Sequence, residues 1–345
     1  MEHLTSLHDL TLWRNAQEET HQRVVLVPTM GALHAGHLQL MKLAKLKGHQ
    51  VIVSIFVNPL QFSPNEDFTL YPRTLAFDLA QCETIGVNAV WTPSMDVFYP
   101  QVTSDTLNHP VQPKDTTVIT PPPWLTSDLC GKTRPEHFTG VATIVFKLLR
   151  LVNPHVAIFG QKDAQQLRVI ECMVQDLQLP VEIIAHPIIR EPLSELAKEL
   201  FQATHGLARS SRNQYLTTSD MHLAGEWFAA TIGHIATQLK GLLTEPTTAH
   251  EAYAPASTPT FLEAWLEAQW SKYLSSVPSH IARWCHKEYL IIKHWQTWQT
   301  LETLEACQHV YHCKGSSLLL AGVCQIKPSS EASPVVRLLD NHLLV

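Results

Sequence analysis

Two histidines three residues apart, His34 and His37, are the side chains whose type and spacing first suggest chemistry in this chain. They stand in the segment Val24-Val-Leu-Val-Pro-Thr-Met-Gly-Ala-Leu-His-Ala-Gly-His37. Imidazoles at this spacing share one face of a helix and can donate hydrogen bonds to one ligand. Gly31 and Gly36 let the backbone turn sharply and come close to that ligand. The segment predicts a site for nucleotide phosphates, although His-x-Gly-His also occurs in purely structural helices.

The elements around the pair place it where α/β sheets bind their ligands. Residues 24–27 are all apolar, as in a parallel strand that is covered on both faces. From Gly36 onward apolar residues have helical spacing, so N–H groups of a first helical turn are expected beside the imidazoles. This is the carboxyl end of a first strand, a typical ligand position. The histidine pair itself is not expected to bind a metal ion, because the sequence has no Cys-x-x-Cys and no third ligand at metal spacing.

Apolar runs and helical patterns alternate through the first half of the chain. Strands are predicted at 24–28, 51–57, 88–92, 155–160 and 181–186, and helices at 36–48, 74–85, 140–152 and 163–177. This alternation predicts βαβ units in a parallel sheet. The fold class is therefore α/β, with a Rossmann-like domain over residues 1–188.

Beyond Ile188 the pattern changes. Helices are predicted around 219–240 and 260–275, and strands around 286–293 and 317–326. We expect residues 189–345 to form a smaller C-terminal α+β lid domain. Segment 100–128 is rich in proline and is predicted to be an irregular excursion. Segment 192–205 is predicted to be a surface helix with an apolar stripe, made of Leu193, Leu196, Leu200 and Phe201.

Composition excludes several classes of partner. The formal net charge is −6, which argues against a nucleic acid as a general partner. Seven cysteines without framework spacing fit reduced thiols. The first residues lack the pattern of a targeting segment, and no apolar run approaches the roughly 18 residues of a membrane helix. We expect a soluble cytoplasmic protein without a membrane partner.

The segment Pro28–His37 resembles the signature of the pantothenate synthetase (pantoate–β-alanine ligase) family, nucleotidyltransferases that share a His-x-Gly-His motif. Five further blocks match that family in order: Ser54–Phe62, Tyr71–Thr74, Arg134–Gly140, Phe159–Gln166 and Gly206–Asn213. The resemblance covers residues 24 to 217 closely. It implies ATP-dependent ligation of (R)-pantoate and β-alanine to pantothenate through pantoyl adenylate, with release of AMP and pyrophosphate. It also implies Mg²⁺ and a homodimer.

The resemblance assigns roles to individual residues. His37 matches the family's proton donor, and we expect it to act in catalysis with His34 and Lys162. The amides Asn58, Gln61 and Gln166 match positions that bind pantoate and β-alanine. ATP contacts are expected from Met30, Gly31, His34, Gly36, His37, Gly160, Lys162, Asp163, Ile189, Arg209, Ser210, Ser211 and Arg212. Asp163 is the expected Mg²⁺ ligand, with the ion also bound by ATP.

The residues themselves leave other interpretations open. Asn58 and Gln61 also fit turn chemistry around Pro59. Asp163 also fits the N-cap of the helix that follows it. The segment 210–213 offers hydroxyls and a guanidinium for a phosphate, but it also fits a polar linker. Arg134 and His137, in a predicted loop, fit either a solvated turn or a substrate contact.

Three positions depart from the family pattern. Gln161 and Cys130 stand where the family usually has glutamates, and Arg209 stands where it has an apolar residue. These changes make the predicted site more positive and leave a catalytically weakened ATP-binding descendant as an alternative. Another nucleotidyltransferase of the superfamily, making a dinucleotide, is a second alternative. A tRNA-charging enzyme is disfavoured, because the net charge provides no basic face.

Overall fold

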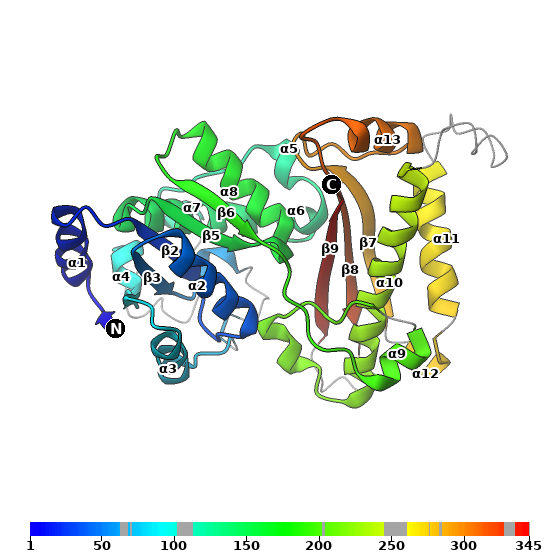
Figure 1. The fold of residues 1–345 in the computed structure, drawn as a ribbon, viewed down its shortest axis with the longest axis horizontal. Coiled ribbons are helices and arrows are strands. Elements are labelled where there is room, and N and C mark those ends of the chain that lie inside the picture. The colour runs from blue at the N-terminus through cyan, green and yellow to red at the C-terminus, as the bar shows by residue number, and fades with distance from the viewer. Residues whose placement is uncertain are drawn as a thin grey trace. The chain divides into compact units, whose positions relative to one another are not determined.

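The computed structural model describes residues 1–62, 68–69, 71–101, 113–201, 204–244, 261–275, 277–282, 285–327 and 335–344. The chain divides into two compact units, Met1–Ile189 and Arg190–Val345 (Figure 1). Each unit has its own sheet, and the two sheets differ in kind. The first is parallel with six strands, and the second is antiparallel with three. The predicted α/β class with a smaller α+β part is confirmed.

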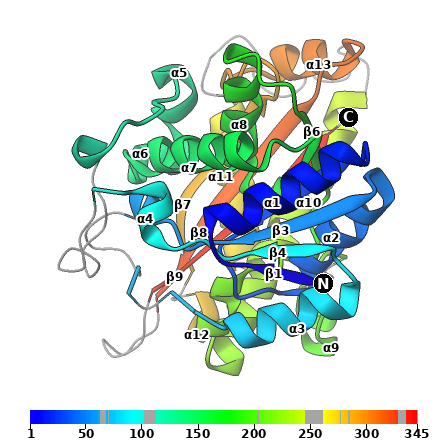
Figure 2. The ribbon, with the colours of Figure 1, turned by 90° about the vertical axis from the view of Figure 1, so that its left-hand side faces the viewer.

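The sheet of the first unit has the order β1-β4-β3-β2-β5-β6. Its strands are β1 (Glu2–Leu4), β2 (Val24–Thr29), β3 (Gln50–Ile55), β4 (Ala89–Trp91), β5 (Val156–Gly160) and β6 (Glu182–His186). Figure 2 shows β1, β4 and β3 side by side at one edge. The three-residue β1 was not predicted, because so short a strand gives no alternation pattern.

Helices cover the first sheet through matched apolar faces. They are α1 (Leu7–Glu19), α2 (Ala35–Lys47), α3 (Leu75–Ile85), α4 (Met95–Phe98), α7 (His137–Val152) and α8 (Ala164–Asp176). Leu40, Met41 and Ala44 of α2 pack on valines of β2 and β3 in one buried cluster. Burial of each such aliphatic side chain contributes about 1.5 to 3 kcal/mol. This packing fixes the start of α2 against the carboxyl end of β2.

The chain order makes β2 a switch point of the sheet. From β2 the chain continues through α2 to β3 on one side, whereas β5 lies on the other side of β2 and is reached from β4. Val27 pairs with Val53 of β3, and Leu26 pairs with Ala157 of β5. Because all three strands are parallel, the residues that follow them lie at one edge. Such an edge is where open α/β sheets bind ligands.

Segment 100–128 is more regular than predicted. It contains a 3₁₀ turn, Pro113–Asp115, and a short helix α5 (Pro123–Thr126), followed by α6 (Leu129–Thr133). Residues 102–112 lie outside the described part of the chain. The side chain of Gln165, on α8, accepts from the backbone of Cys130 at 3.0 Å and donates to the carbonyl of Leu125 at 2.9 Å. This long-range anchoring orders the segment, and local sequence patterns cannot report it.

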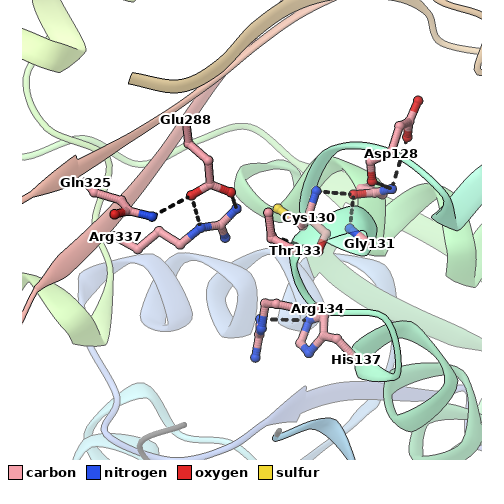
Figure 3. A network of polar contacts seen from close by, with 10 residues as sticks. Asp128, Cys130, Gly131, Thr133, Arg134, His137, Glu288, Gln325 and Arg337 are labelled. Atoms are coloured by element: carbon pink, nitrogen blue, oxygen red, sulfur yellow. Dashed lines mark hydrogen bonds and ion pairs between the residues drawn. The ribbon is translucent and has the colours of Figure 1, made fainter. Parts of the chain in front are cut away.

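The second unit is a three-stranded sheet with helices packed against it. Its elements are α9 (Glu195–Phe201), α10 (Ser219–Thr244), α11 (Phe261–Ser275), α12 (Ser279–Ala282), β7 (Cys285–His294), α13 (Leu304–His312), β8 (Leu318–Ile326) and β9 (Val336–Leu344). The strand order is β7-β8-β9. Figure 3 shows a polar group on this sheet, where Glu288 accepts from Arg337 at 2.6 Å and from Gln325 at 3.2 Å.

Strand β9 was not predicted. Its centre is Asp340-Asn341, two residue types that favour turns, yet both are buried. Asp340 is accommodated there by a two-bond ion pair with Arg190, at 2.6 and 2.7 Å. A buried carboxylate requires such a partner, and here the partner lies 150 residues away in the sequence.

The helix predicted in segment 192–205 exists as α9, but half of its predicted apolar stripe was wrong. Phe201 is buried and Leu193 packs against the core of this unit, as predicted. Leu196 and Leu200 are 50% and 40% exposed, and Ala197 is buried instead. Ser194, the residue before α9, determines which face of the helix is buried. The backbone and the hydroxyl of Ser194 both donate to buried Glu226, at 2.8 and 2.7 Å. This anchoring turns Ala197 and Phe201 inward.

Candidate active site

The two histidines form a capping box at the start of α2. His34 is the N-cap residue, and its Nδ1 accepts from the backbone N–H of Gly36 at 3.1 Å. Nδ1 of His37 accepts from the backbone N–H of His34 at 3.4 Å. The ring centroids are 4.1 Å apart. Because both Nδ1 atoms act as acceptors, the neutral rings carry their protons on Nε2.

Several backbone N–H groups of this turn are already bonded within the protein. Gly31 donates to the Thr29 hydroxyl at 3.2 Å, and Gly36 donates to His34. Ala32 and Leu33 donate to the carboxylate of Asp78 at 3.0 and 2.8 Å. Of these four residues, Gly36 belongs to the first turn of α2, so at least one of the N–H groups expected beside the imidazoles is already bonded within the protein. The fold places both imidazoles at this edge.

The electrostatic surroundings keep His37 neutral. Part of its surface is open, but the ring is surrounded by protein, and this desolvation holds its pKa well below the ordinary value. His34 and Lys162 lower the pKa further, and Asp163 opposes them. These influences also show that residues after β5 act on a ring that follows β2. His37 is thus suited to donate a hydrogen bond through a neutral imidazole.

Lys162 and Asp163 lie where β5 passes into α8. The Lys162 ammonium is 3.4 Å from the Asp163 carboxylate, which is about half exposed at 52%. Asp163 occupies the N-cap position of α8, but its side chain makes no capping hydrogen bond there. Capping therefore does not explain this carboxylate. A lysine and an accessible carboxylate side by side suit a phosphate and its bound Mg²⁺.

The amides after β3 form an ordered relay. Asn58 is 1% exposed, and its Nδ2 donates to the Gly140 carbonyl at 3.1 Å and to Gln61 Oε1 at 3.2 Å. Its Oδ1 accepts from the hydroxyl of Tyr99. Since a carbonyl can only accept, the orientation of the Asn58 amide is fixed, and Gln61 must use Oε1 as an acceptor. The Gln61 Nε2 group then faces Met30, 2.7 Å from its sulfur.

Arg134 lies in the short turn between α6 and α7, in agreement with the predicted loop. His137 does not lie in that loop, because it is the first residue of α7, which starts three residues earlier than expected. The Arg134 guanidinium lies 3.2 Å from the His137 ring (Figure 3). His137 Nδ1 is 2.8 Å from the carbonyl of Gln61. The pair therefore supports the turn that carries Gln61.

The structure also locates the other residues of the first unit that the sequence analysis singled out. Gly160 ends β5, and apart from its two chain neighbours no described residue has an atom within 4 Å of where its Cβ would be. Gln166 is half-buried in the first turn of α8. Ile189 is the last residue of this unit and is also half-buried. Cys130 is buried, and its backbone is held by Gln165.

The predicted phosphate loop belongs to the second unit. Ser210 caps a short 3₁₀ helix, Ser211–Tyr215, and its hydroxyl accepts from the Arg212 N–H at 3.3 Å. Asn213 donates to Glu191 at 2.9 Å and to the carbonyl of Ala208 at 3.1 Å. Within the part of the chain that the structure describes, the buried Nε of Arg209 has no hydrogen-bond partner. The loop is thus held at both ends by its own unit.

Three buried residues support the site but were not predicted: Asp78, Tyr99 and Gln165. Each acts through a partner more than 30 residues away in the sequence. A polar residue in an apolar helical face was the available signal for Asp78, which precedes the buried Cys82 by one turn. Tyr99 and Gln165 gave no comparable signal.

Imidazoles, a lysine and a carboxylate at the carboxyl ends of adjacent parallel strands define a nucleotide-binding α/β protein. Among the described residues, no helix is long and apolar enough to cross a membrane. Nor do three or more His, Cys, Asp or Glu residues of the described ranges form a group that could hold a metal ion.

Comparison with known proteins identifies the family. A profile of the family described as pantoate-beta-alanine ligase matches residues 2–343. The pantothenate synthetase of Idiomarina loihiensis is 48% identical over 225 residues, which are 65% of this chain and 70% of that protein. The bifunctional pantoate ligase/cytidylate kinase of Synechococcus elongatus is 46% identical over 63% of this chain, but the match spans only 37% of that longer protein.

Comparison with solved structures supports the same family. Pantothenate synthetase from Thermus thermophilus has a TM-score of 0.71 at 31% identity, with 99% of both chains covered. The pantoate-beta-alanine ligase of Francisella tularensis, complexed with beta-gamma ATP and beta-alanine, has a TM-score of 0.62 at 27% identity, covering 99% of this chain and 97% of that one. The chain belongs to the pantoate-beta-alanine ligase family. The family predicted from the sequence is confirmed.

Proposed function

We propose that this chain joins pantoate and β-alanine in two steps on one site. In the first, a pantoate carboxylate oxygen attacks the α-phosphorus of ATP, and the bond to pyrophosphate breaks. In the second, the amine of β-alanine attacks the acyl carbon of pantoyl adenylate, AMP leaves, and the amine loses a proton. Neither step requires a protein nucleophile, so catalysis rests on orientation and on stabilisation of phosphate charge.

The observation that carries this proposal is the convergence of His34, His37, Lys162 and Asp163. These side chains follow adjacent parallel strands, and both Lys162 and Asp163 act electrostatically on His37. Neutral imidazoles with protons on Nε2 donate to phosphate oxygens, and the ammonium supplies a point charge. Asp163 would hold Mg²⁺, and the ion would offset phosphate charge there.

Gln61 is the proposed ligand for pantoate. Its Nε2 group is the donor that the relay leaves for a substrate, because Oε1 is taken by Asn58. A thioether is a weak acceptor, so contact with Met30 does not prevent donation to a carboxylate or hydroxyl. A neutral amide binds the nucleophilic carboxylate without pairing its charge. Asn58 then has a positioning role, and Gln166 is the second proposed amide for pantoate.

The remaining contacts complete the proposal. Gly31, Gly36, Gly160 and Ile189 are proposed to approach ATP through their backbones. In the second unit, Ser210, Ser211, Arg212 and Arg209 are proposed to bind its phosphates. We also propose a cytoplasmic homodimer; the seven free cysteines support a reducing compartment. Sedimentation at several protein concentrations tests the dimer.

An AMP-release assay with single omissions tests the proposed function. We expect AMP only when pantoate, β-alanine and ATP are all present, with pantothenate formed in equal amount. A nucleotidyltransferase that makes a dinucleotide would release pyrophosphate without AMP. An ATP-binding descendant would bind ATP but release neither product. Either of these results, from folded protein, would overturn the proposal.

A further inference from the structure

Asp78 lies in α3 and is 1% exposed, yet its carboxylate makes several hydrogen bonds to other segments. Oδ2 accepts from the backbone N–H of Ala32 at 3.0 Å, and Oδ1 accepts from that of Leu33 at 2.8 Å. The hydroxyl of Thr74 lies 3.2 Å from both oxygens. Two successive N–H groups on one anion are the arrangement of an anion-binding nest. Here the anion is the protein's own.

The turn that Asp78 holds has an unusual backbone. Gly31 has φ +80° and Ala32 has φ +50°, so two successive residues adopt the left-handed region. Ala32 carries a Cβ, which makes that conformation unfavourable. Hydrogen bonds to a charged carboxylate are stronger than those between neutral groups, and they offset this strain. Gly31 leaves little room, because a Cβ there would lie 3.0 Å from Asp78 Oδ2.

The held turn connects directly to the reactive groups. Met30 precedes it, and His34 follows it as the N-cap of α2. The capping box then passes this geometry to His37 through the N–H of His34. A shift at Ala32 or Leu33 would therefore move both imidazoles together. The contact with Asp78 ties them to α3, whose Cys82 lies in the same buried cluster as Met41 of α2.

We propose that Asp78 is a positioning residue for adenylation: its buried carboxylate fills the nest of the Gly31–Leu33 turn and thereby sets the places of His34 and His37. This rests on the proposed function for its kinetic consequence. Its structural consequence, the placement of the two rings, does not depend on which reaction the chain catalyses.

The principal test is Asp78→Asn. The amide keeps the shape but has only one acceptor oxygen, so its NH₂ group must oppose the N–H of Ala32 or Leu33. We expect kcat for pantoate-dependent pyrophosphate exchange to fall about 10- to 100-fold, with KM for pantoate changed less than about threefold. Thr74→Val keeps both backbone bonds and should lower kcat less than tenfold, and Thr74→Ser should restore it.

Glu226→Gln is the matched control. Glu226 is also a buried carboxylate that accepts one backbone N–H and one hydroxyl, but its partner is Ser194 in the second unit. It should lower the melting temperature about as much as Asp78→Asn while leaving kcat unchanged. If Asp78→Asn merely matches Glu226→Gln in both measurements, Asp78 is structural only and the proposal is wrong.

A spectroscopic measurement separates this inference from the proposed function. The ¹⁵N shifts of the His34 and His37 rings report their tautomers and protonation. We expect them to change in Asp78→Asn and in Thr74→Val but not in Glu226→Gln. Unchanged ring signals would overturn the proposal even if Asp78→Asn were too unstable for kinetics, because Thr74→Val reports the same coupling. Altered ring signals without any exchange activity in the wild type would instead refute the proposed function alone.

Discussion

His34 and His37 contact one another directly: the backbone N–H of His34 donates to Nδ1 of His37 at 3.4 Å, and the ring centroids are 4.1 Å apart. Protonation of His37 is unfavourable, because desolvation, the largest influence, and the neighbouring His34 both lower its pKa. His37 therefore presents an N–H donor without a charge. The Lys162 ammonium supplies a positive charge.

This division of roles predicts a large loss of kcat for each of two substitutions. His37→Ala and Lys162→Ala should each lower kcat by about two to four orders of magnitude, because each removes stabilisation of charge in the transition state. His8→Ala, an exposed histidine of α1, is the control and should leave kcat unchanged. Steady-state kinetics and circular dichroism measure both effects. Retention of more than a tenth of kcat by His37→Ala would contradict its placement on the phosphates.

The orientation of the Gln61 amide predicts how its replacement by glutamate, which has the same shape but a negative charge, changes KM for pantoate. Gln61→Glu keeps the oxygen that accepts from Asn58 but places a second oxygen where Nε2 was. Repulsion of the pantoate carboxylate should raise KM for pantoate about 10- to 100-fold while changing KM for ATP less than threefold. The surface substitution Gln299→Glu is the control for added charge. A larger change in KM for ATP than in KM for pantoate would show that Gln61 does not bind pantoate.

Two ion pairs should contribute very differently to stability. Asp340 is 1% exposed and bonds Arg190 at 2.6 Å, so Asp340→Asn leaves a guanidinium without its counter-charge and should cost about 3 to 5 kcal/mol. Arg23 and Glu182 pair at 2.9 Å, but both side chains are about half exposed. Glu182→Gln should change the free energy of unfolding by less than about 1 kcal/mol. Urea denaturation measures the free energy of unfolding of both variants. Equal losses of stability would refute the role given to the Asp340–Arg190 pair in β9.

Stability should fall in mild acid partly through His342. Burial, the largest influence, and nearby Arg190 lower its pKa from 6.5 to about 4, although Asp340 opposes them. The folded state thus favours the neutral ring, so this contribution is present above pH 6.5 and is lost as the pH falls toward 4. At pH 5 the loss should be about 2 kcal/mol.

The measurement is the urea midpoint at pH 7.5 and at pH 5. His342→Gln removes the titrating group, so its midpoint should fall less between these pH values than that of the wild type. Substitution of the exposed His8 by Gln should leave the wild-type difference in place. An equal fall in all three proteins would show that His342 does not carry the effect.

The sequence was sufficient where a signal is local. The four valine and leucine residues of β2, the glycines after it and the helical spacing of α2 all lie within one segment, and they predicted both the sheet and its ligand edge. Prediction from the sequence failed where the position of a side chain depends on a partner that is distant along the chain. Asp340 is of a residue type that favours turns, and the partner that keeps it in a strand, Arg190, lies 150 residues away. The contact of Ser194 with the distant Glu226 likewise determines which face of α9 is buried. Asp78 stood out as a polar residue in an apolar helical face, but the sequence did not indicate that it holds the turn at Ala32.

Isotope exchange tests the central claim most directly. If pantoate attacks ATP before the amine enters, labelled pyrophosphate should exchange into ATP with pantoate present and β-alanine absent. His37→Ala should suppress this exchange, and omission of pantoate should abolish it. The account predicts exchange that needs only pantoate, ATP and Mg²⁺. Exchange that strictly requires β-alanine would contradict a separate pantoyl adenylate and would favour one concerted step.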